Sequence, residues 1–393
     1  MNPVIEIFLR IMVFLMGASI GSFLNVVIYR VPLGISVGDP KRSFCPHCKE
    51  PIPWYQNIPV FSWIALRGRC AGCGAGISPR YLGVEVLTGL LFLVLWLLVA
   101  ERLLPLGMGG GWWLVVPYWV LVSLCVVTVF VDLEHFIIPD GVTVGGTVAG
   151  LAFSTLMPKL MGADRWWEGL GWSAFGAAAG FGILWVVVEL GKKAFGRLKL
   201  DFGEGARWVA CQDEKEEEPA LTLGEESYLW SDLFFRKSDR LIIEAQEVAV
   251  QPQPGVAEGR RFGRSKVTIS EAGFLVEESG LGGGAGEAGE FFELETLERV
   301  DGTALKVVIP REAMGFGDVK FMAMVGAFLG WQAVLFTIFV ASVSGTAVAL
   351  PARLLGREGW ASKVPFGPYL VLGALLWVFA GEAMMAWYFG LLR

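Results

Sequence analysis

Several runs of about twenty apolar, uncharged residues constrain the fold of this chain more than any other feature. A helix of that length spans the hydrocarbon core of a bilayer, and soluble domains rarely contain such runs. Hydrophobic residues also make up 54% of the 393 residues. We therefore predict an all-α polytopic membrane protein with about eight transmembrane helices. The predicted spans are residues 4–28, 82–100, 112–131, 141–158, 169–190, 319–335, 333–351 and 367–390.

An acidic segment interrupts this predicted membrane body. Residues 200–312 contain 24 acidic and 12 basic residues, whereas the rest of the chain contains 14 acidic and 20 basic ones. The run QDEKEEEPA is typical of disorder, and three later stretches alternate between apolar and polar residues as strands do. We predict a small β-rich cytoplasmic insert, partly disordered, with a hairpin turn at Asp301–Gly302. The alternating stretches are RLIIEAQEVAV, SKVTISEAGFLVE and FFELETLERVDGTALKVVIP.

The distribution of lysine and arginine predicts the orientation of the spans. Basic residues gather in the loops after the first and fifth spans and before the last one. By the positive-inside rule, the N-terminus lies outside and the segments 29–81 and 191–318 are cytoplasmic. The predicted domains are a first transmembrane helix at 1–29, a cytoplasmic four-cysteine loop at 30–81, transmembrane helices at 82–191, the acidic insert at 192–312 and the last transmembrane helices at 313–393.

Two CxxC pairs lie in the first cytoplasmic loop. The chain reads CPHC at 45–48 and CAGC at 70–73, which places Cys45, Cys48, Cys70 and Cys73 in the pattern C-x2-C-x21-C-x2-C. Four thiolates at this spacing suit tetrahedral zinc. A pair of disulfides is the alternative, but a cytoplasmic loop keeps its thiols reduced. Because four cysteines leave no open coordination position, the sequence predicts a structural zinc site.

Two aspartates lie at predicted cytoplasmic ends of spans, where a charged residue is costly. Asp132 directly follows an apolar run in VFVDLEHFIIPD, and Asp318 precedes one in MGFGDVKFM. Gly315 and Gly317 leave the approach to Asp318 free of bulky side chains, as an extended peptide would need. We interpret Asp140, which follows a proline at the start of the next span, as a helix N-cap.

Asp132 and Asp318 predict an aspartic peptidase, provided that the fold brings them together. Two like charges about 3 Å apart cannot both ionise, so the pair would share a proton. One carboxylate would then act as general base on a water while the other polarises the scissile carbonyl, and which one is the base stays open. Catalysis by histidine has little support, because the chain contains two histidines and no HExxH motif.

Several stretches together resemble the type IV prepilin peptidases, the membrane aspartic proteases of the GxGD kind. They follow the order of the family's motifs and cover nearly everything outside residues 193–312. The long insert departs from the family pattern, in which the segment before GxGD is usually far shorter. The matching stretches are GASIGSFLNVVIYRVP at 17–32, the CPHC and CAGC pairs, PWYQNIPVFSWIALRGRC at 53–70, ISPRYLGVEVLTG at 77–89, DLEHFIIPD at 132–140, GFGDVK at 315–320 and PFGPYL at 365–370.

The resemblance implies a bifunctional enzyme of the bacterial inner membrane. Such an enzyme would cut the leader from type IV prepilins or type II secretion pseudopilins at the cytoplasmic face. It would then methylate the new N-terminal amine with S-adenosylmethionine. Besides these substrates and membrane lipid, we expect no nucleic-acid partner.

The resemblance also assigns roles to individual residues. Asp132 and Asp318 would be the catalytic pair. The four-cysteine loop would bind zinc on the methyltransferase side, and Gly68 would be needed for methyl transfer. The remaining motif residues around Asp318 are Gly315, Gly317 and Lys320.

Two other functions stay open. One is a peptidase without methylation, as in family members that lack the cysteines. The other is a non-enzymatic, zinc-stapled membrane scaffold of a pilus or secretion machine, which would tolerate Asp318→Asn. The role of the insert at 192–312 is open as well, among gating of access, binding of a pilus-assembly partner and no catalytic part.

Overall fold

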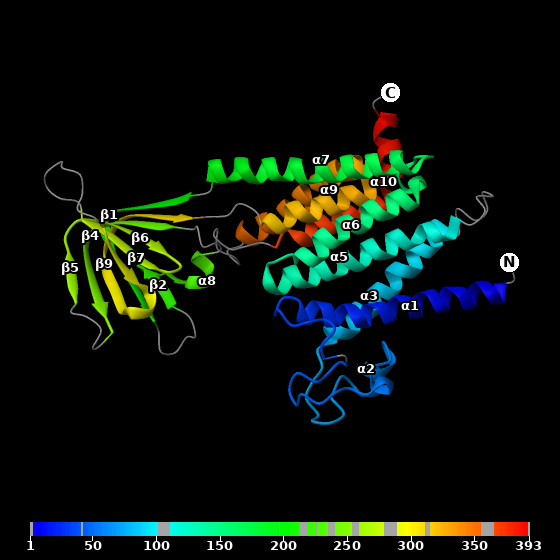
Figure 1. Ribbon diagram of the computed structural model, residues 1–393, viewed down its shortest axis with the longest axis horizontal. Coiled ribbons are helices and arrows are strands. Elements are labelled where there is room, and N and C mark those ends of the chain that lie inside the picture. Colours follow the sequence, from blue (N-terminus) through cyan, green and yellow to red (C-terminus); the bar gives the residue numbers. More distant parts are fainter. Residues whose placement is uncertain are drawn as a thin grey trace. The chain divides into compact units, whose positions relative to one another are not determined.

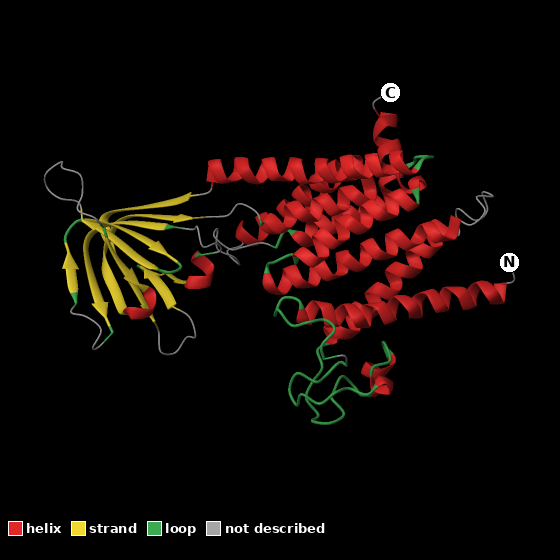
Figure 2. Cartoon of the chain, in the orientation of Figure 1, coloured by secondary structure: helices red, strands yellow, loops and turns green. Residues whose placement is uncertain are grey.

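The computed structural model divides the chain into two units (Figure 1). The first consists of residues Met1–Val187 and Met314–Arg393, and the second of Val188–Ala313. Helices dominate the first unit and strands the second (Figure 2). The described residues are 3–40, 42–100, 111–195, 197–212, 219–224, 226–234, 240–253, 259–278, 289–310, 315–354 and 365–391.

The first unit is built from long apolar helices. α3 shows how local sequence sets a helix start, because the Ser78 side chain accepts a hydrogen bond from the Arg80 N–H and Pro79 occupies the first turn. The helices are α1 Pro3–Arg30, α2 Phe61–Ala65, α3 Pro79–Leu95, α5 Val115–His135, α6 Asp140–Leu156, α7 Trp166–Phe195, α9 Phe316–Leu354 and α10 Gly367–Leu391. Short turns of 3-10 or π type lie at Trp54–Gln56, Trp96–Ala100, Gly111–Leu114 and Pro158–Met161.

Five of the described helices are long and apolar enough to cross a membrane. α6 has 17 residues, and α10 contributes the shorter apolar stretch Gly367–Gly381. α9 has 39 residues but takes non-helical angles at Gly330, with φ 80° and ψ 173°. The prediction of several apolar membrane helices is therefore confirmed. The count differs, because five described helices meet the length and composition of a span and the sequence predicts about eight. The five are Pro3–Arg30, Pro79–Leu98, Val115–His135, Trp166–Lys193 and Phe316–Pro351.

Glycines bring α1 and α3 into close contact. A Cβ at Gly17 would lie 2.8 Å from Cβ of Phe92, and one at Gly21 would lie 2.8 Å from Cα of Glu85. The two glycines form a GxxxG pattern, which lets helix backbones approach closely in a membrane. α1 and α3 therefore frame the cysteine loop that connects them.

A second glycine contact joins α7 to α9. A Cβ at Gly176 would lie 2.2 Å from the carbonyl oxygen of Gly326, and one at Gly326 would lie 2.0 Å from that of Gly176. Gly180, one turn further along α7, approaches the α9 backbone in the same way. Ser173 adds a hydrogen bond of 2.6 Å to the Ala327 carbonyl. Direct backbone contact thus fixes the first half of α9.

In the second unit, the nine described strands form one antiparallel sheet in the order β3-β2-β1-β9-β4-β6-β7-β8, with β5 paired to β4. The core lies on the buried face of this sheet, where Trp208 and Phe274 are fully buried. The strands are β1 Arg197–Gln212, β2 Pro219–Leu223, β3 Glu226–Leu229, β4 Leu241–Pro252, β5 Arg260–Phe262, β6 Ser265–Ser270, β7 Gly273–Glu278, β8 Glu290–Glu293 and β9 Leu297–Pro310. Two short helical segments accompany them, α8 Trp230–Leu233 and Leu294–Thr296.

The three stretches that the sequence predicts as strands are confirmed as β4, as β6 with β7, and as β8 with β9. The predicted hairpin turn at Asp301–Gly302 is wrong, because both residues lie inside β9 and pair with β1 on one side and β4 on the other. Gly302 allows close packing instead, since a Cβ there would lie 2.2 Å from the carbonyl oxygen of Glu247 and 3.1 Å from Nε1 of Trp208.

The predicted all-α class holds for the first unit but not for the whole chain. Strands build most of the second unit, because its alternating residues bury one apolar face across a sheet. The predicted disorder around QDEKEEEPA falls mainly on residues 213–218, which lie outside the described residues.

Candidate active site and metal centre

Asp132 lies in the last turn of α5 and is 6% exposed. The helix ends at Phe136, which takes a left-handed φ of 53° and donates its N–H to the Asp132 carbonyl. Oδ2 of Asp132 accepts a 2.9 Å hydrogen bond from the backbone N–H of Gly367, at the start of α10. The motif PFGPYL contains this glycine, but only the fold reveals its contact with the carboxylate.

Asp318 lies in the first turn of α9 and is also 6% exposed. Its backbone N–H donates to the Gly315 carbonyl at 3.2 Å. A Cβ at Gly317 would lie 3.0 Å from Cβ of Ile138, in the segment between α5 and α6. The space beside Gly317 is thus filled by another part of the chain, so packing explains this glycine without an approaching peptide.

The structure brings Asp132 and Asp318 together. Asp132 lies at the end of α5 and Asp318 in the first turn of α9, and these two helices contact each other. Gly317, the neighbour of Asp318, packs on Ile138, six residues after Asp132. α5 ends at this point and α9 begins there, so the pair lies at one end of the helical unit. Both carboxylates are largely buried, and two such groups held close together can share a single proton.

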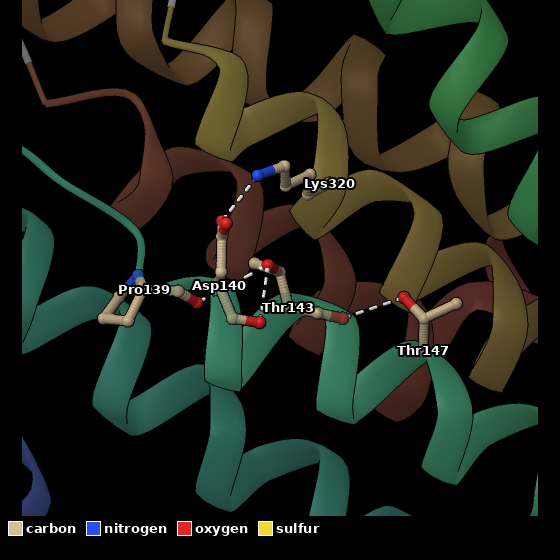
Figure 3. Close-up of polar contacts among 5 residues, drawn as sticks. All are labelled: Pro139, Asp140, Thr143, Thr147 and Lys320. Carbon is tan, nitrogen blue, oxygen red and sulfur yellow. Dashed lines mark hydrogen bonds and ion pairs between the residues drawn. The ribbon is translucent and has the colours of Figure 1, made fainter. Parts of the chain in front are cut away.

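Lys320 bonds to Asp140 at the start of α6 (Figure 3). Its Nζ lies 2.6 Å from Oδ1 of Asp140. The predicted N-cap role of Asp140 is wrong, because the extended Pro139 holds the cap position and Asp140 is already the first helical residue. Its carboxylate is therefore turned to Lys320, while the Thr143 hydroxyl lies 3.4 Å from the carbonyls of Pro139 and Asp140.

Each CxxC pair folds into the same short turn. The Cys45 carbonyl accepts a 2.8 Å hydrogen bond from Lys49, and the Cys70 carbonyl accepts one of 2.9 Å from Gly74. Lys49 and Gly74 both take left-handed angles, with φ 62° and 73°. In both turns the N–H of the first cysteine also donates to the carbonyl five positions on, at 3.0 and 2.8 Å. The two turns are therefore structural repeats that direct their sulfurs alike.

The sulfurs of Cys45, Cys48, Cys70 and Cys73 all lie within 4.8 Å of one another. Those of Cys45 and Cys73 are 3.9 Å apart. Four thiolates bound tetrahedrally to zinc at about 2.3 Å would be about 3.8 Å apart, so the cluster fits this metal. Hydrogen bonds from the backbone of Cys73 and Gly72 lower the pKa of the Cys70 thiol to about 7. Burial and hydrogen bonds to the neighbouring cysteines raise the pKa of the Cys48 thiol to about 12, so the fit to metal rests on the sulfur geometry.

Gly68 lies between α2 and the second cysteine pair, with φ 65°. Its N–H donates to the Trp63 carbonyl at 2.9 Å, and its own carbonyl accepts from Ile77 at 2.7 Å. A Cβ at this position would lie 2.7 Å from the Trp63 ring. Both the backbone angle and the indole ring therefore disfavour any side chain here.

Two family models match the chain. The model described as bacterial peptidase A24 N-terminal domain matches residues 15–99, which contain the cysteine loop. The model described as type IV leader peptidase family matches residues 119–205 and 276–350, which contain Asp132 and Asp318.

Three relatives of this chain share one name, prepilin leader peptidase/N-methyltransferase. The protein from Klebsiella pneumoniae is 37% identical over 197 residues, which cover 49% of this chain and 78% of the relative. The one from Aeromonas hydrophila is 28% identical over 406 residues, covering 96% and 92%. The one from Myxococcus xanthus is 44% identical over 203 residues, about half of each chain at 52% and 54%. No solved structure matches. The chain thus belongs to the type IV leader peptidase family.

Proposed function

We propose that this protein removes the leader peptide of type IV prepilins or type II secretion pseudopilins and then N-methylates the new N-terminal residue. The observation that carries the proposal is the placement of two buried carboxylates, Asp132 at the end of α5 and Asp318 at the start of α9, on helices that contact each other. The names of the relatives support both activities, and the convergence of four cysteines beside the helices supports the second.

For leader removal, one carboxylate of the pair takes a proton from water while the other, protonated, donates a hydrogen bond to the scissile carbonyl. The carbonyl carbon gains the hydroxyl group, the C–N bond breaks, and the new amine takes up a proton. The Gly367 N–H holds Oδ2 of Asp132, which limits the rotation of that carboxylate. Positioning of this kind keeps both acids aimed at one peptide bond.

The proposed topology places this pair at the cytoplasmic face. Asp132 ends α5 and Asp318 begins α9, as expected for helices that reach the same membrane face from opposite chain directions. We propose eight crossings: α9 contributes one on each side of Gly330, and α6 and α10 contribute one each. The N-terminus would then lie outside the inner membrane, as the basic loops predict.

We propose that the four-cysteine cluster holds zinc. Its donor set and spacing fit a closed tetrahedral site, which has no open position for substrate. Its role would therefore be to hold the loop from residue 43 to residue 76 in one shape.

For methyl transfer, S-adenosylmethionine would supply the methyl group when bound and leave as S-adenosylhomocysteine. The amine must lose its proton before it attacks, so the site has to be near a group that accepts one. An ion pair between Arg80 and Glu134 connects the start of α3 to the α5 end that carries Asp132. This ion pair holds the end of the cysteine loop close to the helix end that carries Asp132. A newly formed amine would then reach the methyl-transfer site before it diffuses away.

The acidic insert is the remaining part of the proposal. Its sheet is a self-contained unit with its own core. We propose that it binds a partner of the pilus or secretion assembly.

The test is to co-express the chain with a type IV prepilin in bacterial membranes and to weigh the mature pilin by mass spectrometry. We expect leader removal and one added methyl group with the wild type, and intact precursor with Asp132→Asn or Asp318→Asn. Removal without the methyl group would favour a peptidase alone. Cleavage that survives both substitutions would favour the membrane scaffold and refute the peptidase assignment.

A further inference from the structure

A cavity of about 350 Å³ lies between α1, the cysteine loop and the start of α3. One cysteine from each CxxC pair borders it. Its volume lies in the range of small-molecule sites, which combine mostly apolar walls with a few polar groups. Residues that line it include Asn25, Tyr29, Trp63, Tyr81 and Glu85.

Asn25 gives this cavity an unpaired hydrogen-bond acceptor. The residue is 2% exposed, and its Nδ2 donates to the Tyr81 carbonyl at 3.0 Å. Its Oδ1 is buried and has no hydrogen-bond partner within the described part of the chain. A buried acceptor left without a donor costs about 1–3 kcal/mol, so its presence in a cavity wall points to a ligand that brings an N–H or O–H.

Glu85 gives the cavity a carboxylate. Its Oε2 accepts a 2.7 Å hydrogen bond from the backbone N–H of Val60. Val60 has φ 66°, an angle that a β-branched residue takes only when its surroundings impose it. Ser22 also lines the cavity and adds a further polar group to its wall. The hydrogen bond from Val60 fixes the orientation of the carboxyl group in the cavity wall.

We propose that this cavity binds the methyl donor S-adenosylmethionine, with Asn25 and Glu85 as its polar contacts; this inference rests on the methyl transfer proposed above. The sulfonium of the donor is a cation, which a carboxylate and aromatic faces attract. Its adenine and amino groups carry N–H donors for Oδ1 of Asn25. The adenine ring also suits a wall that contains the Trp63 indole.

The cavity also gives Gly68 a physical role. The Trp63 ring lines the cavity and packs directly on Gly68, while its Nε1 donates to the Ile77 carbonyl at 3.2 Å. A side chain at position 68 would displace this ring from its place in the wall. Gly68 is therefore a positioning residue, which acts on the donor site through Trp63.

The test measures binding of radiolabelled S-adenosylmethionine to the purified, zinc-loaded, full-length protein by equilibrium dialysis. We expect Asn25→Ala to weaken binding about tenfold, as for the loss of one buried hydrogen bond. We expect Gly68→Ala to weaken it at least as much. Zinc content and the midpoint of thermal unfolding report whether each variant is folded.

Gly34→Ala is the matched control for Gly68→Ala. Gly34 has φ 67°, close to the 65° of Gly68, but a Cβ there would meet nothing within 4 Å. Both substitutions carry the same backbone strain, and only the one at Gly68 reaches the Trp63 ring. Wild-type affinity in Gly34→Ala, together with weak binding in Gly68→Ala, would support the role of the ring. Equal losses in the two variants would refute it.

A second measurement separates this inference from the proposed function. Ultraviolet cross-linking of the labelled donor, followed by peptide mapping, should place the label within residues 22–30, 43–66 or 70–85. Two results would overturn the cavity assignment and leave the methyltransferase activity standing. One is a wild type that methylates pilin but carries the label elsewhere, and the other is an Asn25→Ala variant that binds the donor as tightly as the wild type. A wild type that neither binds the donor nor methylates pilin would overturn both.

Discussion

The backbone N–H of Gly367 donates a 2.9 Å hydrogen bond to Oδ2 of Asp132, although the two residues are 235 positions apart in the chain. The contact places the first residue of α10 against the buried carboxylate at the end of α5. It also leaves no space for a side chain, since a Cβ on Gly367 would lie 2.6 Å from the same oxygen. The N-terminus of α10 therefore sets the orientation of one half of the proposed acid pair.

Gly367→Ala should lower the rate of leader removal about 100-fold, because displacement of a reacting group by about 1 Å can cost that much. The added methyl group cannot fit without moving the Asp132 carboxylate or the start of α10. The measurement is the initial rate of prepilin cleavage by purified enzyme. Gly390→Ala, in the same helix and with nothing within 4 Å of its Cβ, should cleave at the wild-type rate. Equal rates in both variants would show that the Gly367 contact does not position Asp132.

Asp140→Asn should leave leader removal close to the wild-type rate, in contrast to Asp132→Asn. Asp140 lies in an exposed ion pair with Lys320, and pairs of this kind contribute at most about 1 kcal/mol to stability. Parallel cleavage assays and thermal unfolding of the two asparagine variants provide the check. If Asp140→Asn lost cleavage while its unfolding midpoint stayed unchanged, Asp140 would have to take part in catalysis.

The sequence predicts those parts of the structure that depend on short, repeated spacing. Two CxxC pairs form matching turns because each closes by hydrogen bonds within six residues. Likewise β4, β6, β7 and β9 follow from alternating stretches whose buried apolar residues form one core. The pairing of β1 with β2 was not predicted, although Trp208 and Val209 begin an apolar stretch there.

Contacts between distant segments are harder to predict, because the residues of one segment do not identify the segment that it packs against. Gly302 follows an aspartate and therefore looks like a turn, but it lies inside β9, where a side chain would collide with the carbonyl oxygen of Glu247 on β4. The contact between Gly367 and Asp132 depends on the packing of α10 against α5. The GxxxG pattern from Gly176 to Gly180 was a readable signal of close helix packing, but it does not identify α9 as the partner.

Cys45→Ser should reduce bound zinc from about one ion per chain to near zero, because a tetrahedral site with one thiolate lost binds the metal far more weakly. We also expect loss of methyl transfer, since the loop wall of the donor cavity would lose its shape. Elemental analysis of the purified protein and the mass of the processed pilin provide the two readouts. Cys125→Ala is the control, because Cys125 is buried in α5, outside the cluster. Full zinc content in Cys45→Ser would refute the assignment of this cysteine as a ligand.

Gly326→Ala should destabilise the helical unit by about 1–3 kcal/mol, as overpacking of a tight contact does. Its Cβ would lie 2.0 Å from the Gly176 carbonyl oxygen, so α7 and α9 would have to separate. Gly182→Ala tests the same change where a Cβ on α7 would meet nothing within 4 Å, and there we expect unchanged or slightly higher stability. Reversible unfolding in detergent compares the two. A Gly326→Ala variant as stable as Gly182→Ala would mean that the two helices do not pack through their backbones. The first half of α9, and Asp318 with it, would then need another support.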